Sequence, residues 1–96
     1  MFWALEAGRV DLRGLDIGQG VSDIQTLNEW ATEGRLEVTA ISMGAYPAVA
    51  ERYVLLPHGA SLGRGYGPVV VAREALTLDA LRELEIVIPG RLTTAY

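Results

Sequence analysis

The chain has 96 residues, of which 50% are hydrophobic, and it carries a formal net charge of −4 at pH 7. This composition argues against a disordered chain, and the lack of any run of basic residues argues against nucleic acid or an anionic membrane as a partner. The chain has no cysteine, no lysine and one histidine, which excludes disulfides, thiol catalysis, Schiff-base chemistry and a multi-histidine metal site within these residues. We therefore expect neither a metal nor a cofactor.

Helices are predicted at four places along the chain. The clearest covers residues 21–34, where Ser22 can cap the start, Gln25 completes a capping box and Gly34 is placed for a left-handed stop. Its apolar residues share one stripe at helical spacing, namely Ile24, Leu27, Trp30 and Ala31. The other predicted helices cover residues 2–7, a stretch that begins between Ser42 and Pro47 and ends near Arg52, and residues 78–84.

Short apolar segments between these helices are predicted to be strands. They cover residues 15–18, 36–41, 53–56, 68–72 and 85–88. The continuous valine run at 69–71 is typical of a strand whose two faces are both covered. Strands that alternate with helices predict an α/β fold with a mostly parallel sheet flanked by helices. A further helix is expected to open at Thr93 or Thr94.

The beginning of the chain is apolar but brief. It lacks the basic leader of a signal peptide, and no apolar run reaches the roughly 20 residues that span a bilayer. A soluble cytoplasmic protein is therefore expected.

Small hydroxyl residues come after two of the predicted strands. Ser42 comes after the strand 36–41, and Thr93 and Thr94 come after the strand 85–88. In open α/β sheets ligands bind beyond the carboxyl ends of the strands, and the free N–H groups of a helix start suit a carboxylate or another polar oxygen. The alternative is that these residues only cap helices, as serine and threonine often do.

Three further polar residues stand in suggestive places. Arg64 lies in a glycine-rich loop at 63–68 and could bind a carboxylate, although an ordinary crossover loop with a solvated arginine is the favoured explanation. His58 could act as an acid or base, but it has no obvious partner. Asn28 of the main helix could reach a ligand or make a structural hydrogen bond. Taken alone, these residues do not identify a reaction.

Several segments, taken in order, resemble the 1,4-dihydroxy-6-naphthoate synthase family. They are residues 23–28, 38–42, 45–46, 53–56, 60–68 and 89–95, and the most specific of them is the string Leu-Gly-Arg-Gly-Tyr-Gly-Pro at 62–68. The resemblance implies a cytoplasmic enzyme of menaquinone biosynthesis in the futalosine pathway, a lyase that acts on cyclic dehypoxanthine futalosine. It also implies a fold like that of type II periplasmic binding proteins, in which two α/β lobes close over a small-molecule substrate.

The resemblance also implies which residues meet the substrate. The family's substrate contacts fall on Ala40, Ile41, Ser42, Thr94 and Ala95. The family's catalytic histidine lies on a segment that this chain lacks, and His58 does not match it. Neither Arg64 nor Asn28 is assigned a contact, and many members have a histidine where Gly44 stands.

The family's first strand and its second lobe are not found here. We therefore expect residues 1–96 to be a partial first lobe, inactive alone and prone to self-association, because unpaired strands would expose backbone groups and apolar faces.

Other functions stay open at this point. A non-catalytic solute-binding module can share the same fold, and fold alone does not separate it from an enzyme. The sister enzyme that dehydrates chorismate is a third possibility, although the string Gly-Arg-Gly-Tyr-Gly-Pro argues against it. A truncated product with no function is the fourth.

Overall fold

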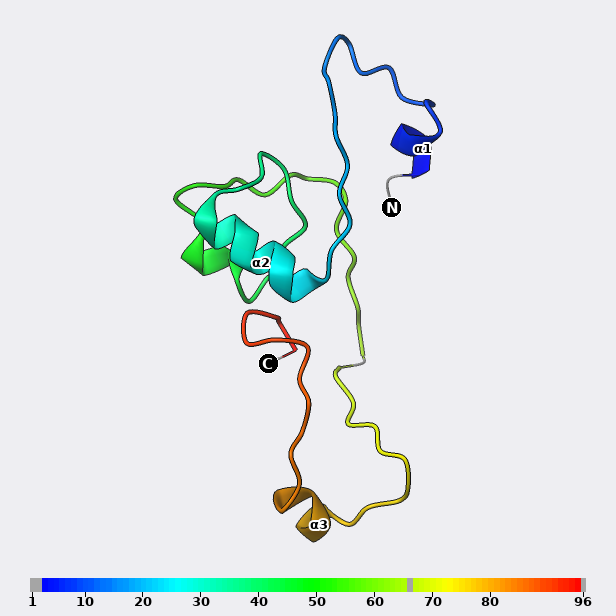
Figure 1. The fold of residues 1–96 in the computed structure, drawn as a ribbon, viewed down its shortest axis with the longest axis vertical. Helices are drawn as coiled ribbons and strands as arrows, with labels where there is room; N and C mark the ends of the chain where they lie inside the picture. The colour runs from blue at the N-terminus through cyan, green and yellow to red at the C-terminus, as the bar shows by residue number, and fades with distance from the viewer. Residues whose placement is uncertain (1–2, 66, 96) are drawn as a thin grey trace.

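The computed structural model describes residues 3–65 and 67–95. Its elements are short: α1 (Trp3–Glu6), α2 (Ile24–Glu33), the 3-10 helix η1 (Tyr46–Ala48) and α3 (Leu78–Arg82). Extended chain and turns connect them (Figure 1). Phe2 of the first predicted helix and Tyr66 of the glycine-rich loop lie outside the described residues. None of the helices in the described part is long and apolar enough to cross a membrane.

The predicted parallel sheet is wrong for this structure, because residues 3–65 and 67–95 contain no strand. A strand needs a neighbour that takes up its N–H and C=O groups, and the predicted strand segments run without a ladder. Their valines are exposed accordingly: Val54 83%, Val69 84%, Val71 86% and Val87 93%. β-Branched composition indicates a preference for extended backbone but does not supply a partner.

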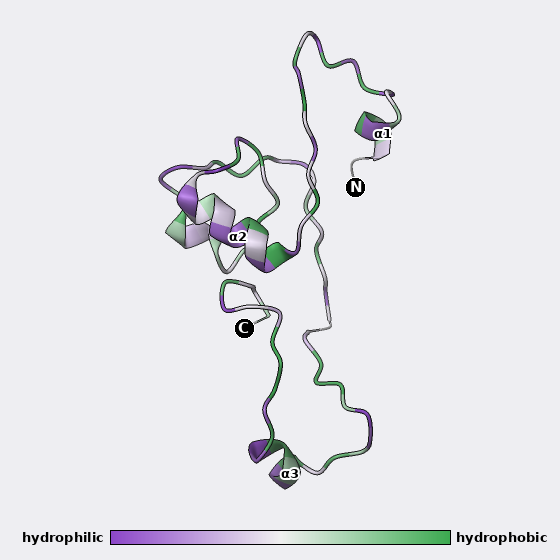
Figure 2. Ribbon diagram, in the orientation of Figure 1, coloured by the Kyte–Doolittle hydropathy of each residue, from purple (hydrophilic) through white to green (hydrophobic). Residues whose placement is uncertain are grey.

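Residues 3–65 and 67–95 bury little apolar surface. Ala31, Ala45 and Val49 are the buried hydrophobic residues of the described chain. The accessible surface is 8824 Å², whereas a folded monomer of this mass exposes about 5,400 Å². The radius of gyration is 17.5 Å, against about 12–13 Å for a compact chain of this length. Figure 2 shows hydrophobic residues along the extended segments outside α2.

Helix α2 has a well-defined start and end. Asp23, rather than the predicted Ser22, caps it: its side chain accepts bonds from the Thr26 N–H at 3.0 Å and the Thr26 hydroxyl at 2.5 Å. Gly34 ends it at φ 71°, as predicted, and its N–H donates to the Ala31 carbonyl. In the left-handed region glycine avoids the cost that a Cβ would bring.

The remaining helices are shorter than predicted. Thr77 caps α3 by accepting a bond from the Ala80 N–H at 3.2 Å, and the helix ends at Arg82 instead of residue 84. The helix predicted to end near Arg52 is reduced to η1, with Pro47 in its first turn. The helix predicted at Thr93 or Thr94 is a turn.

The cap of α2 makes a prediction about pH. The Thr26 hydroxyl, followed by the Thr26 N–H, holds the pKa of Asp23 below its ordinary value of 3.8. A lowered folded-state pKa means that the stabilisation is present above 3.8 and is lost as the pH falls through the folded-state pKa. We expect a carboxyl ¹³C titration of the chain to place Asp23 below 3.8, and Thr26→Val to raise its pKa. Titration at or above 3.8 in the unsubstituted chain contradicts the cap.

Candidate functional site

The candidate site is built around one buried amide on α2. Asn28 is 0% exposed. Its Nδ2 donates to the Ser42 hydroxyl at 3.2 Å and to the Leu92 carbonyl at 3.0 Å. Its Oδ1 accepts the Ser42 N–H at 2.9 Å. One side chain therefore joins two segments that are far apart in the sequence and holds both against α2.

A second amide on α2 supports the same loop. The Oε1 of Gln25 accepts the Leu92 N–H at 3.0 Å. Gln25 and Asn28 are three residues apart, so they lie on one face of the helix. Together they bind both backbone polar groups of Leu92, which a neighbouring strand would otherwise do.

The Ser42 segment and the loop at 90–94 also touch directly. The Gly44 N–H donates to the Thr94 hydroxyl at 3.0 Å. A Cβ on Gly44 would lie 3.3 Å from the Thr94 Cα, so the absence of a side chain permits this approach. Figure 1 shows the C-terminal turn beside the α2 region. The structure thus brings the predicted Ser42 and Thr94 to one place.

The other predicted contact residues flank this pair in sequence. Ala40 and Ala95 are exposed and Ile41 is half-buried. Thr93, by contrast, is buried at 7% exposure, and both its N–H (3.2 Å) and its hydroxyl (2.8 Å) donate to the Gly90 carbonyl. Thr93 therefore stabilises the turn, in line with the alternative of a structural role.

His58 and Arg64 do not join the candidate site. Both side chains are exposed, and within residues 3–65 and 67–95 neither takes part in a hydrogen bond or ion pair with the site residues. The structure gives no support to a chemical role for either.

The part that Gln25 plays in this arrangement was not predicted from the sequence. The capping-box interpretation assigned its side chain to the start of α2, whereas its Oε1 binds Leu92 and its Nε2 donates to Glu29 at 2.8 Å. The sequence did contain one indication of this arrangement, namely the two amide side chains of Gln25 and Asn28 at positions i and i+3 of the helix. That spacing places both on one face but does not say which segment they meet.

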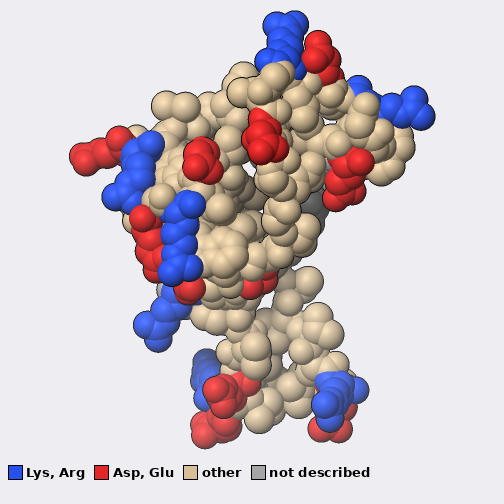
Figure 3. All heavy atoms as spheres, turned by 45° about the horizontal axis from the view of Figure 1, so that its top comes forward, with Lys and Arg blue, Asp and Glu red and all other residues tan. Residues whose placement is uncertain are grey.

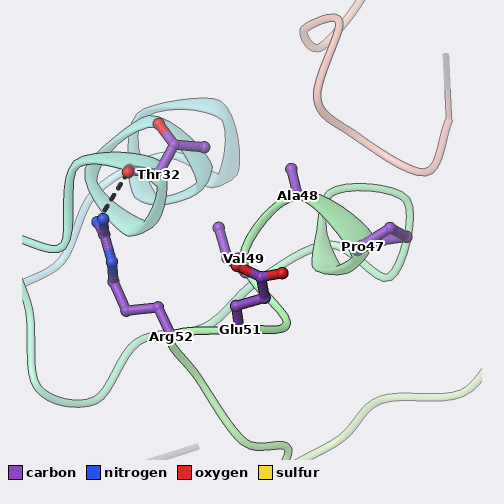
Figure 4. A pocket seen from close by; sticks show the side chains of 6 residues that line it. All are labelled: Thr32, Pro47, Ala48, Val49, Glu51 and Arg52. Atoms are coloured by element: carbon purple, nitrogen blue, oxygen red, sulfur yellow. Dashed lines mark hydrogen bonds between the residues drawn. The ribbon is translucent and has the colours of Figure 1, made fainter.

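An open hollow lies between the last turn of α2 and the segment around η1. It has a volume of about 560 Å³ and is lined by Thr32, Pro47, Ala48, Val49, Glu51 and Arg52 (Figure 4). Arg52 donates from Nη1 to the Thr32 carbonyl at 2.9 Å, and a cation at the carbonyl end of a helix stabilises that end. The hollow contains none of the predicted contact residues, and its arginine is already used to hold α2.

Comparisons with known proteins cover the whole chain. The protein-family model described as "Menaquinone biosynthesis" matches residues 1–96. A 1,4-dihydroxy-6-naphthoate synthase of Thermus thermophilus is 49% identical over 96 residues, which is 100% of this chain and 34% of the relative. The Streptomyces coelicolor protein of the same name is 41% identical over 98 residues, 100% of this chain and 33% of that relative.

These matches cover only part of each relative. The chain spans about a third of the length of the curated relatives. No solved structure matches it. Because the family model matches from the first residue to the last, the chain belongs to the menaquinone biosynthesis family that the model describes.

Proposed function

We propose that these residues form part of the substrate-binding surface of a 1,4-dihydroxy-6-naphthoate synthase. The reaction in this proposal is a lyase-type cleavage of cyclic dehypoxanthine futalosine in the futalosine pathway. Two named relatives and the family match support the enzyme assignment. The alternative, a solute-binding module, has no comparable support.

The observation that carries the proposal is the contact between the Ser42 segment and the turn at Thr94. Gly44 and Thr94 are 50 positions apart, yet their N–H and hydroxyl are 3.0 Å apart. Thr94 is exposed and Ser42 is half-buried, so both hydroxyls can reach a bound molecule. In the proposed site they donate hydrogen bonds to polar oxygens of the substrate, and Ala40, Ile41 and Ala95 supply its flanking surface.

The charge distribution suits a small ligand with a few polar oxygens better than a polyanion. Figure 3 shows acidic and basic side chains interspersed over the face in view. The hydrogen-bonding side chains described around Ser42 are neutral amides and hydroxyls. Ligand recognition there would depend on hydrogen bonds rather than on net charge.

The chemistry itself is proposed to come from outside this surface. The chain's resemblance to the family implies that the base of the reaction is a histidine, and His58 does not match it. A positioned base removes the proton that starts the elimination. The isolated 96 residues are accordingly expected to yield no product when incubated with the substrate.

A chimaera tests the proposal. The 96 residues replace the matched segment of the Thermus thermophilus relative, and formation of 1,4-dihydroxy-6-naphthoate from cyclic dehypoxanthine futalosine is measured. Loss of one hydrogen bond to substrate weakens binding by roughly 3–10-fold, so Ser42→Ala and Thr94→Val should each lower kcat/KM by about that factor.

The matched control is Thr32→Val, which removes a hydroxyl that donates to the Glu29 carbonyl at 2.7 Å on α2. This variant should retain the activity of the parent chimaera. An active chimaera that tolerates both Ser42→Ala and Thr94→Val without loss would contradict the proposed site. Retained ligand binding without any turnover would favour the solute-binding alternative.

A further inference from the structure

The orientation of the Asn28 amide is fixed by two backbone groups. The Ser42 N–H can only donate, so the Asn28 atom that meets it at 2.9 Å must be the oxygen. The Leu92 carbonyl can only accept, so the atom that meets it at 3.0 Å must be the nitrogen. The amide cannot be reversed without placing two donors or two acceptors face to face.

This orientation also determines what the Ser42 hydroxyl does. The Asn28 Nδ2 lies 3.2 Å from the hydroxyl oxygen and donates to it. A hydroxyl that accepts a bond on one side still has its own hydrogen to donate. Within the described part of the chain that hydrogen is not used in a hydrogen bond, and Ser42 is only half-buried.

The Thr94 hydroxyl has the same arrangement. It accepts the Gly44 N–H at 3.0 Å, and Thr94 is exposed. Both hydroxyls therefore receive an internal donor and keep a hydrogen for a group outside the protein. At Ser42 the donor is a side chain, so the arrangement can be reversed by mutation.

We propose that Asn28 is a positioning residue that sets the Ser42 hydroxyl as an outward-facing donor. The group recognised at this position must then be an acceptor oxygen, such as a carboxylate or a ketone carbonyl. A ligand hydroxyl could bind here only by accepting the hydrogen bond from Ser42 with one of its lone pairs. The kinetic consequences rest on the proposed function, whereas the hydrogen-bond geometry does not.

The test is Asn28→Asp in the chimaera. The new side chain has nearly the same shape and can still accept the Ser42 N–H. When ionised it has no hydrogen to donate, so it loses the bond to the Leu92 carbonyl. It accepts a hydrogen bond from the Ser42 hydroxyl instead, which turns that donor inward. We expect KM for cyclic dehypoxanthine futalosine to rise at least tenfold where the carboxylate is ionised. KM should recover as the pH is lowered and the carboxyl regains a proton, while kcat changes less.

The matched control is Gln19→Glu, the same amide-to-carboxylate exchange at an exposed position outside the candidate site. Within the described residues Gln19 makes no hydrogen bond to Ser42 or Leu92. This variant should not introduce the pH-dependent KM. An equal pH-dependent KM in both variants would overturn the proposal, because it would reflect an added charge rather than the Ser42 hydroxyl.

A double variant tests whether Asn28→Asp raises KM through the Ser42 hydroxyl. Ser42→Ala removes the hydroxyl, so the pH-dependent rise in KM that Asn28→Asp causes should be much smaller in this background, where only the lost bond to the Leu92 carbonyl remains. Independent, additive effects of the two substitutions would overturn a role that acts through Ser42.

NMR of the unsubstituted 96-residue chain tests the geometry even if Asn28→Asp does not fold. The Asn28 side-chain N–H₂ hydrogens should exchange slowly and show Overhauser contacts to the Ser42 β protons. Rapid exchange without those contacts overturns the proposal. If the contacts are present while Ser42→Ala leaves kcat/KM of the chimaera unchanged, the proposed function fails and the hydrogen-bond geometry stands.

Discussion

Asn28→Ala is expected to release the Ser42 segment from α2 while leaving the helix intact. The substitution removes three hydrogen bonds and leaves the Ser42 N–H and the Leu92 carbonyl without their Asn28 partner. Ser42 and Leu92 are half-buried, so each lost hydrogen bond should cost about 0.5–1.5 kcal/mol. The Ser42 amide should therefore exchange with solvent roughly 2–12-fold faster in hydrogen-exchange NMR. Alanine is the best helix former, so the amides within α2 should be protected at least as well as before.

The control for this substitution is Glu29→Ala. Glu29 is the next residue of α2 and is exposed, and within the described chain its carboxylate accepts a hydrogen bond from the Gln25 amide rather than from the Ser42 segment. Its replacement should leave exchange at Ser42 unchanged. Equal acceleration in the two variants, or none in Asn28→Ala, would show that Asn28 does not hold the segment.

Gly90→Ala should displace the turn that carries Thr94. Gly90 has φ 139°, which L residues rarely adopt, and holding a non-glycine residue there costs about 1–3 kcal/mol. A Cβ would also lie 2.6 Å from Cγ of Gln25 and closer still to that side chain's amide oxygen. Because this oxygen accepts the Leu92 N–H, relieving the collision breaks the bond. We expect changed shifts and faster exchange for the Leu92 amide, and loss of the contact between Gly44 and Thr94.

Two other substitutions separate the causes. Gly20→Ala adds a Cβ where no atom lies within 4 Å and φ is not positive, and it should leave the turn unchanged. In the Gly90→Ala background, Gln25→Ala removes the collision but not the backbone strain, so it should restore the contact between Gly44 and Thr94 only in part. A Leu92 amide that is unaffected by Gly90→Ala would contradict the close packing of this turn on α2.

The parts of the fold that sequence analysis predicted are those decided by neighbouring residues. The apolar stripe and Gly34 located α2, because helix hydrogen bonds and the left-handed stop involve residues within one turn. The cap was wrong by one position, since Ser22 and Asp23 can both accept the N–H of the first turn. In the structure Asp23 has the extended backbone of an N-cap residue, and its side chain accepts the Thr26 N–H.

The predicted sheet failed because strand pairing depends on distant residues. The valines at 69–71 have the composition of a covered strand, but the described residues form no strand and these valines are exposed. Composition indicates that a segment prefers extended backbone, not where its partner lies. In this structure the link between remote segments is made by side chains of α2 rather than by a ladder.

The position of the candidate site was nevertheless predicted in part. Ser42 and Thr94 were expected to lie together at adjacent strand ends. They do lie close to each other, although the described residues contain no strands, because Asn28 and the Gly44 N–H make the connection. The Asn28 and Gln25 contacts could not be derived from spacing, since i,i+3 periodicity fixes the helix face and not its partner. Whether these residues bind substrate stays a prediction.

Helix α2 holds Ser42 and Thr94 at one place through its buried amide. Nuclear Overhauser contacts in the 96-residue chain are the measurement that decides this. We expect cross-peaks from the Gly44 N–H to the Thr94 side chain and from the Asn28 side-chain amide to Ser42, alongside the sequential contacts of α2. A spectrum with a formed α2 but with neither of these long-range contacts would contradict it.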